Sequence, residues 1–231
     1  MNSSSSNQSD SLSHSPKEIA THYRMDAAAA WACARFPVLS RLAPHEQIAE
    51  GIRRGLDLHM FKRTRLMPRV SATLGLLLGL GPADLLDLGT GRGSFLWPLL
   101  EALPELPVTC VDLDPQSIER IQAVGSVRPA VLQGHCVDLT SLPFGDASFD
   151  CVTLLETLEH IPDATAALQE ALRVAQRWLV VSVPSEPDEN PEHIHLFTEE
   201  QLRHLTLTAG GRIAKIANVS GHWIALISPA A

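Results

Sequence analysis

The spacing of apolar positions changes near residue 80 of this 231-residue chain. Before that point, Ala-rich and Leu/Arg-rich segments have helical spacing and are interrupted at Pro37, Pro44 and Pro68. After Pro82, short apolar runs alternate with longer amphipathic runs, which is typical of strand–helix–strand units and a parallel sheet. The pattern therefore predicts several helices up to Leu80, followed by an α/β domain.

Seven short apolar runs are candidate strands. They are Asp84–Leu88, Val108–Leu113, Ala130–Gly134, Phe149–Leu155, Trp178–Pro184, Arg212–Val219 and Trp223–Ser228. Amphipathic runs at Pro115–Val124 and Ala164–Ala175 are expected to be helices between strands. Only Ser220-Gly221-His222 separates the last two strands, which favours an antiparallel hairpin. We therefore expect a mostly parallel seven-stranded sheet that ends in an antiparallel hairpin.

Composition along the chain suggests three parts. Residues 1–16 are rich in Ser and poor in apolar side chains, so we predict a disordered tail, followed by a helical cap over residues 17–80 and the main domain over residues 81–231. The tail lacks the apolar core of a secretory signal, and the longest apolar run, Val70–Leu80, is too short to span a membrane. None of the four cysteines has C-x-x-C spacing, so reduced thiols are expected. These features predict a soluble, cytoplasmic protein with no membrane partner.

The charge of the chain bears on the class of its partner. A net charge of −8 and an aromatic content of 5% disfavour nucleic acid, because Lys and Arg bind phosphates and single strands stack on aromatic rings. A local exception is a basic stretch that contains Asp57 as its single acid. Its basic members are Arg53, Arg54, Lys62, Arg63, Arg65 and Arg69. We interpret this stretch either as a solvated helix face or as an anchor for a carboxylate or phosphate on a small-molecule substrate.

A glycine-rich turn carries the most specific chemistry. An apolar strand runs into Gly-x-Gly-x-Gly at residues 89–93 and then into a helical segment. A Cβ at such a position would block a ligand from approaching the backbone, although a tight strand–helix turn needs the same residues. Asp112 ends the next strand 19 residues after Gly93, where an acid can accept hydrogen bonds from both hydroxyls of a ribose. Asp87 precedes the turn, and its carboxylate favours a ligand with an ammonium or sulfonium over a diphosphate.

With these motifs in this order, the chain resembles the class I S-adenosylmethionine methyltransferases of types 11 and 12, from about Leu80 to the C-terminus. Residues 138–144, followed by 148–150, are similar to the family's adenine-binding acid, its Leu-Pro-Phe turn and the start of its fourth strand. The resemblance implies a Rossmann-like α/β fold, an N-terminal helical extension and an enzyme that uses S-adenosylmethionine. It implies that the glycine turn contacts the methionine portion, Asp112 the ribose, and Asp138 with Leu139 the adenine. The cofactor-binding set that we expect is Asp87, Gly89, Gly91, Gly93, Asp112, Leu113, Asp138 and Leu139.

A cluster of acids and histidines follows the fourth and fifth predicted strands, at the edge of the sheet where ligands of such folds bind. Glu156, Glu159 and His160 have i, i+3, i+4 spacing and would share one face of a helical turn. The loop after the fifth strand brings either His193 or His195 into the same neighbourhood and ends where Thr198 is expected to cap a helix. We take His160, His195 and Glu159 as the candidate catalytic residues.

Three roles are open for this cluster. Its side chains could order the loop by bonding backbone amides, or His160 or His195 could be a general base that takes a proton from an acceptor hydroxyl. Alternatively, Glu156, Glu159, His160 and His195 could hold Mg, Mn or Zn. That arrangement is similar to the metal site of the small-RNA 3′-end 2′-O-methyltransferases, and the segment is also similar to the ubiquinone-pathway O-methyltransferases. We favour a reaction without a metal, because this similarity covers only short segments. An activated sulfonium methyl group needs mainly alignment with its acceptor, so no catalytic triad is required.

The sequence therefore predicts in-line methyl transfer to an O or N atom of a small, hydroxylated and anionic acceptor. One alternative is a metal-assisted RNA ribose 2′-O-methyltransferase, and another is a non-catalytic regulatory module that binds S-adenosylmethionine. A nicotinamide oxidoreductase is a further alternative, which the expected absence of a separate substrate domain disfavours.

Overall fold

The computed structural model describes residues 22–62, 65–128 and 130–230. The chain forms two compact units, divided between residues 63 and 64. The tail predicted over residues 1–16 lies outside the described residues, and so does Arg63 of the basic stretch. None of the helices within the described ranges is long and apolar enough to cross a membrane.

The first unit is helical, as the spacing of its apolar residues predicts. It contains α1 (His22–Arg35), η2 (Pro37–Arg41), α2 (Pro44–Arg53) and η3 (His59–Phe61). Proline stands in the first turn of η2 and of α2, where its fixed φ suits a helix start and its missing N–H would have no partner in any case. Small alanines on α1 are fully buried and α1 packs on α2, so this unit has an apolar centre of its own.

The second unit holds the sheet and most of its helices. Its strands are β1 (Leu85–Leu88), β2 (Val108–Asp112), β3 (Leu132–Cys136), β4 (Phe149–Leu155), β5 (Ala175–Pro184), β6 (Gly211–Asn218) and β7 (His222–Pro229). Its helices are α3 (Pro68–Leu80), α4 (Leu96–Ala102), α5 (Pro115–Gly125), η4 (Leu158–His160), α6 (Ala164–Val174) and α7 (Glu199–Thr208). The sequence analysis grouped α3 with the N-terminal cap, whereas the structure packs it with the sheet. The reason is its apolar side, since Val70, Leu74 and Leu77 are buried and α3 contacts β7.

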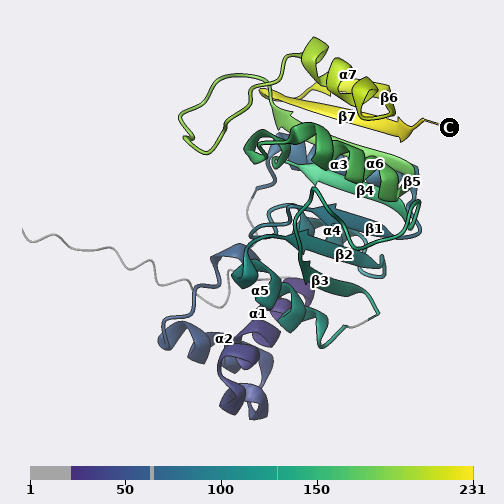
Figure 1. Cartoon of the computed structure of the whole chain (residues 1–231). Helices are drawn as coiled ribbons and strands as arrows, with labels where there is room; N and C mark the ends of the chain where they lie inside the picture. The colour runs from purple at the N-terminus through teal and green to yellow at the C-terminus, as the bar shows by residue number, and fades with distance from the viewer. Residues whose placement is uncertain (1–21, 63–64, 129, 231) are drawn as a thin grey trace, which may run out of the picture. The chain divides into compact units, whose positions relative to one another are not determined.

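The strands lie in the order β3-β2-β1-β4-β5-β7-β6 (Figure 1). The first five strands of the sequence pair in parallel, and β7 runs antiparallel to both of its neighbours, so the predicted fold with a terminal hairpin is confirmed. The bounds of β3 and β5 differ from the prediction by two residues or more, and those of the other strands by at most one. β3 begins at Leu132 because Arg128 holds the preceding residues in a turn, and β5 begins at Ala175, directly after α6 ends.

The connections leave β1 in one direction toward β2 and β3 and in the other toward β4 and β5. Ligands of open parallel sheets bind at such a switch point, beyond the carboxyl ends of the strands. Apolar side chains of β1, β4 and β5 pack with those of α6 and α7 into a continuous core on one face. The carboxyl ends of β1 and β4 are therefore held side by side by a packed core. All four cysteines are free, and Cys136 is exposed.

Candidate functional site

The glycine turn after β1 brings backbone close to other parts of the site. Gly89, Gly91 and Gly93 all have positive φ, between 55° and 79°, which favours glycine. A Cβ at Gly89 would lie 2.3 Å from Oγ1 of Thr157, and one at Gly93 would lie 2.3 Å from Nε1 of Trp97. A Cβ at Gly91 would meet no atom within 4 Å, so this glycine faces open space. Two glycines thus serve packing, and Gly91 leaves backbone accessible to a ligand.

Asp87 lies in β1, where the sequence pattern alone would place an apolar residue. Its side chain is buried, and its Oδ1 accepts a 2.7 Å hydrogen bond from Thr153, which stands opposite it on β4. Burial raises the pKa of Asp87 from 3.8 to about 6, against the lowering effect of the Thr153 hydrogen bond. The carboxylate is ionised at neutral pH and lines a cavity, so it is placed to bind a cation.

The ends of β2 and β3 carry the residues that we expected at a nucleoside. One oxygen of Asp112 accepts a hydrogen bond from the Gly91 N–H at 2.6 Å, and the other accepts one from the Asp114 N–H at 2.8 Å. Asp138 is exposed, and its hydrogen bonds with the backbone and hydroxyl of Thr140 lower its pKa. Each oxygen of Asp112 still has a lone pair that can accept a hydrogen bond from a ligand.

Two adjoining cavities open at this edge of the sheet and share Gly89, Gly91 and Glu156. The smaller has a volume of about 210 Å³. Its lining includes Met67, Arg69, Asp87, Thr90, Arg92, Phe95 and Ser182. The larger has a volume of about 800 Å³ and is lined by Asp112, Leu113, Asp138, Leu139, Thr140, Thr157, His160, Ile161, Pro162, Asp163 and Glu192 in addition to the shared residues. Seven of the eight predicted cofactor-binding residues line one or both cavities. The eighth, Gly93, packs on Trp97.

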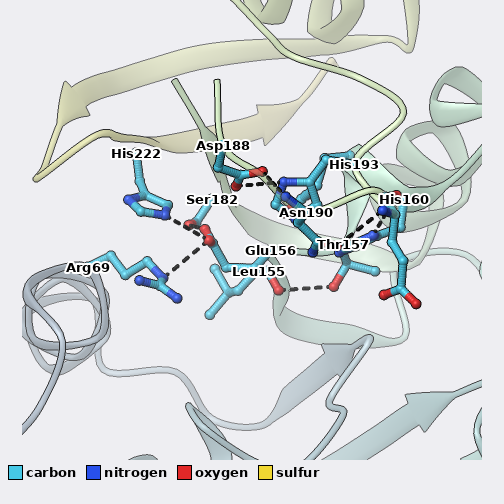
Figure 2. A network of polar contacts seen from close by, with 12 residues as sticks. Arg69, Leu155, Glu156, Thr157, His160, Ser182, Asp188, Asn190, His193 and His222 are labelled. Carbon is cyan, nitrogen blue, oxygen red and sulfur yellow. Dashed lines mark hydrogen bonds and ion pairs between the residues drawn. The ribbon is translucent and has the colours of Figure 1, made fainter. Parts of the chain in front are cut away.

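Glu156 stands at the junction of the two cavities and has a φ of 53°, which is unusual for a residue with a side chain. Figure 2 shows Arg69 and His222 pointing to its carboxylate. Glu156 Oε2 lies 3.2 Å from Nε of Arg69 and 3.0 Å from Nε2 of His222, while Oε1 accepts a hydrogen bond from Ser182. Nδ1 of His222 lies 2.9 Å from the carbonyl oxygen of Ser220. Both ring nitrogens of His222 thus face oxygen atoms, which fixes the orientation of the ring beside Glu156.

Glu159, His160 and His193 form a second cluster, which lies under the loop after β5. Glu159 is fully buried, and its two carboxyl oxygens have no hydrogen-bond partner among the described residues. Burial raises its pKa from 4.5 to about 8, so Glu159 is protonated at neutral pH. One oxygen of Glu159 and one nitrogen each of His160 and His193 lie within 4.8 Å of one another.

The loop holds both histidine rings of this cluster by their Nδ1 atoms. His160 Nδ1 lies 2.9 Å from the carbonyl oxygen of Glu192, and His193 Nδ1 lies 2.8 Å from Oδ2 of Asp188 (Figure 2). A proton on each Nδ1 satisfies these contacts, so in the neutral ring the lone pair is on Nε2. The loop is fixed in turn by the carbonyl oxygen of Glu159, which accepts hydrogen bonds from the N–H groups of Ile194 and His195.

The structure does not bring all the candidate catalytic residues together. Nε2 of His195 lies 3.0 Å from the carbonyl oxygen of Ile161, and its ring lies beside Phe197 at a different cavity. Glu156 and Glu159, predicted to share one face, point to different partners because the helical turn η4 begins only at Leu158. Of the two histidines that the sequence left open, His193 lies in the cluster. Ser182 and His222 were missed; the only sequence signal was a polar residue that interrupts the apolar run of β5.

Comparison with known proteins agrees with this geometry. Residues 86–178 match a family described as the methyltransferase domain. The matched segment contains the glycine turn and the ends of β2, β3 and β4, which line the two cavities. Over these residues the chain is similar to methyltransferase domains, and its fold is that of an S-adenosylmethionine-dependent methyltransferase.

Curated relatives match over parts of their length. The demethylmenaquinone methyltransferase of Roseiflexus castenholzii is 36% identical over 92 residues, which cover 39% of this chain and 37% of that protein. The 27-O-demethylrifamycin SV methyltransferase of Amycolatopsis mediterranei is 34% identical over 115 residues, which cover 48% of this chain and 40% of that protein. The chain thus spans less than half the length of these relatives.

Solved structures share the fold at low sequence identity. Magnesium protoporphyrin IX methyltransferase from Synechocystis PCC 6803, with bound S-adenosylhomocysteine, superposes with a TM-score of 0.60 at 18% identity and covers 79% of this chain and 95% of that chain. The cyclase SpnF superposes with a TM-score of 0.60 at 19% identity and covers 71% of this chain and 80% of that chain. At these identities the likeness shows the fold alone, and one neighbour with this fold is a cyclase.

The buried carboxylate of Asp87 makes a prediction about stability. Its raised pKa means that the ionised form destabilises the folded state above pH 6, and that this cost fades as the pH falls toward 3.8. In Asp87→Asn the amide oxygen can still accept the Thr153 hydrogen bond without the charge. We expect the free energy of unfolding in urea to increase by about 2 kcal/mol at pH 8, and by about 1 kcal/mol less than that at pH 5.

Glu189→Gln, in the exposed loop, is the control and should change the free energy of unfolding little at either pH. A loss of stability in Asp87→Asn at pH 8 would contradict the argument from burial.

Proposed function

We propose that the protein transfers a methyl group from S-adenosylmethionine to an O or N atom of a small-molecule acceptor. The observation that carries the proposal is the pair of adjoining cavities that share Gly89, Gly91 and Glu156. The smaller cavity suits the amino-acid end of the cofactor, and the larger suits the nucleoside together with an acceptor. S-adenosylmethionine supplies a sulfonium methyl group that is already activated, so the protein's main task is alignment.

Charged residues of the smaller cavity match a zwitterion. Asp87 offers a buried carboxylate for the ammonium of the methionine portion, and Arg69 offers a guanidinium for its carboxylate. Glu156 fixes Arg69 through Nε, which leaves the terminal nitrogens of the guanidinium available to a ligand. His222 and Ser182 hold Glu156 in turn, so residues from α3, β5 and β7 position one cation.

The larger cavity gives the nucleoside and the acceptor separate ends. Asp112 and Leu113 lie at the end of β2 and Asp138 and Leu139 follow β3, so they provide acceptors for ribose hydroxyls and an apolar contact for adenine. Residues of the segment after β4 and of the loop after β5 line the other end. An acceptor bound there would lie beyond the sulfonium, in line with the bond that breaks.

His160 is the residue that we propose as general base. It lines the larger cavity, and its Nδ1 is held by the Glu192 carbonyl, so Nε2 carries the lone pair that can take a proton from an acceptor hydroxyl or amine. His195 lies at a different cavity, so we assign it a structural role in holding the segment around Ile161.

The role of Arg69 can be tested by comparing two ligands. S-adenosylhomocysteine has the amino-acid group, whereas 5′-methylthioadenosine has the same nucleoside and a thioether without it. We expect Arg69→Met to lower the affinity for S-adenosylhomocysteine about 10- to 50-fold, because a charge-assisted hydrogen bond is lost. The affinity for 5′-methylthioadenosine should change less than about twofold. Isothermal titration calorimetry measures both affinities.

Arg203→Met is the control for Arg69, because Arg203 pairs with Glu199 on the exposed side of α7. It should leave both affinities unchanged. If Arg69→Met lowers the affinity for both ligands equally, Arg69 supports the cavity and does not bind the amino-acid group. If the wild type binds neither ligand, the proposed function is wrong.

The role of His160 can be tested with the acceptor identified from a labelled-methyl screen of cell extracts. We expect His160→Ala to lower kcat about 100-fold while the affinity for S-adenosylhomocysteine stays within about twofold, because a general base acts only in the chemical step. His195→Ala is the matched control and should keep kcat within about threefold. The assignment is reversed if His195→Ala is the variant that loses turnover. Binding of the cofactor with no transfer to any acceptor would instead favour a regulatory module.

The Glu159 cluster favours a second candidate, methyl transfer to a hydroxyl assisted by a divalent metal. Glu159, His160 and His193 are one carboxyl and two imidazoles, a donor set that suits Mn or Zn. Asp188 and the Glu192 carbonyl hold the two Nδ1 atoms, as the outer contacts of histidine ligands commonly do. Neither carboxyl oxygen of Glu159 has a hydrogen-bond partner within the described part of the chain, and a bound metal would give one of them a partner. An RNA ribose hydroxyl is one acceptor of this kind.

Metal binding can be measured without turnover. We expect MnCl₂ or ZnCl₂ to raise the Tm of the purified protein by several degrees and Glu159→Gln to abolish this shift, because a neutral amide is a poor ligand for either ion. Glu156→Gln is the control that separates the two glutamates, and it should keep the shift, since Glu156 is already engaged by Arg69 and His222. No shift in the wild type, with no metal in the purified protein, would leave Glu159 as a structural residue.

A further inference from the structure

The larger cavity has carboxylates from several elements along its lining. They are Asp112, Asp138, Glu156, Asp163 and Glu192. No Lys or Arg is found among the described residues that line this cavity, and His160 is its single basic side chain. A cleft lined by one sign of charge attracts ligands of the opposite sign and disfavours those of the same sign.

Four of these carboxylates already have a role. Asp112 and Asp138 lie at the end that suits the nucleoside, and Glu156 is paired with Arg69 and contacts His222. Asp163 precedes α6 and accepts a hydrogen bond from the Ala166 N–H at the start of that helix. These four therefore leave one acid to be explained.

Glu192 is the acid without a role inside the protein. Its backbone N–H bonds the side chain of Asn190 and its carbonyl oxygen bonds His160, whereas its carboxylate makes no hydrogen bond or ion pair with the described residues. It lies on the loop that passes over the candidate base, at the end of the cavity opposite the nucleoside residues. Glu192 therefore lines the cavity next to the proposed base, with a carboxylate that no described residue engages.

The remaining walls at this end are apolar. Ile161 and Pro162 line the cavity beside His160, so a bound molecule meets hydrocarbon surface as well as the Glu192 carboxylate. Arg69 and Arg92 line the smaller cavity, where Arg69 is paired with Glu156. Neither guanidinium is among the described residues that line the larger cavity.

We propose that the acceptor is a small molecule with an apolar body and an ammonium group, and that Glu192 binds the ammonium and selects this class of acceptor. The inference rests on the proposed methyl transfer and reverses the expectation of an anionic acceptor. Glu192 is a specificity residue, since its carboxylate contacts a part of the acceptor and takes no part in the chemical step.

The first experiment determines the charge of the product. The purified protein is incubated with S-[methyl-³H]adenosylmethionine and a small-molecule cell extract, with and without EDTA. The labelled products are then passed over cation- and anion-exchange resins at pH 7. We expect the enzyme-dependent label to be retained by the cation exchanger, with the same yield in EDTA.

The second experiment uses that acceptor to test Glu192. We expect Glu192→Gln to raise the KM for the acceptor about three- to fivefold and Glu192→Lys to raise it at least about tenfold, with kcat within about twofold in both. The KM of the wild type should rise with added NaCl more steeply than that of Glu192→Gln. Glu189→Lys makes the same charge change on the same loop at a residue that does not line the cavity, and it should leave KM unchanged.

The outcomes separate this inference from the proposed function. An anionic or neutral labelled product, or an equal effect of Glu189→Lys and Glu192→Lys on KM, would overturn the inference while leaving methyl transfer intact. A neutral product that forms only without EDTA would overturn it in favour of the metal-assisted candidate. Bound S-adenosylhomocysteine with no labelled product in any extract would contradict the transferase function itself.

Discussion

The site depends on the close contact between the glycine turn after β1 and the segment after β4. Gly89 has no Cβ, and the side chain of Thr157 occupies the space that a Cβ would need. Because β1 and β4 are neighbouring parallel strands, this contact brings the glycine turn against the segment that begins with Glu156. The two cavities therefore meet at Glu156, and in the proposed reaction the methyl group is transferred near this junction.

The same segment places two glutamates in opposite electrostatic situations. Glu156 contacts Arg69, His222 and the hydroxyl of Ser182, so both of its carboxylate oxygens have polar partners. Glu159 has no donor for its carboxyl among the described residues, and burial keeps it protonated at neutral pH. A positive φ at Glu156 turns the backbone between β4 and η4, which is why the two side chains diverge. Glu156 can position a cation. Glu159 is neutral until a bound cation displaces its proton or a base removes it.

Sequence alone predicted the parts of this fold that local pattern controls. The seven strands, the hairpin and the cap of α7 at Thr198 follow from hydrophobic period and turn chemistry, and the structure confirms them. The cofactor residues could be named because they lie in consecutive strand ends, where chain order gives spatial order. His222 could not be found this way: it comes from the antiparallel strand β7, and only the register of β7 with β5 brings it to Glu156.

The choice between His193 and His195 shows the limit more sharply. The two histidines are two residues apart on an irregular loop, so no regular spacing assigns either one to the site. The choice is made by the Glu159 carbonyl, which bonds the N–H groups of Ile194 and His195 and so fixes the rotation of the loop. With that rotation His193 lies beside His160, His195 lies beside Phe197, and Glu192 lines the larger cavity. A single backbone acceptor at Glu159 thus decides which side chains face the larger cavity, and any change that moves this carbonyl would alter the proposed base and the proposed specificity residue together.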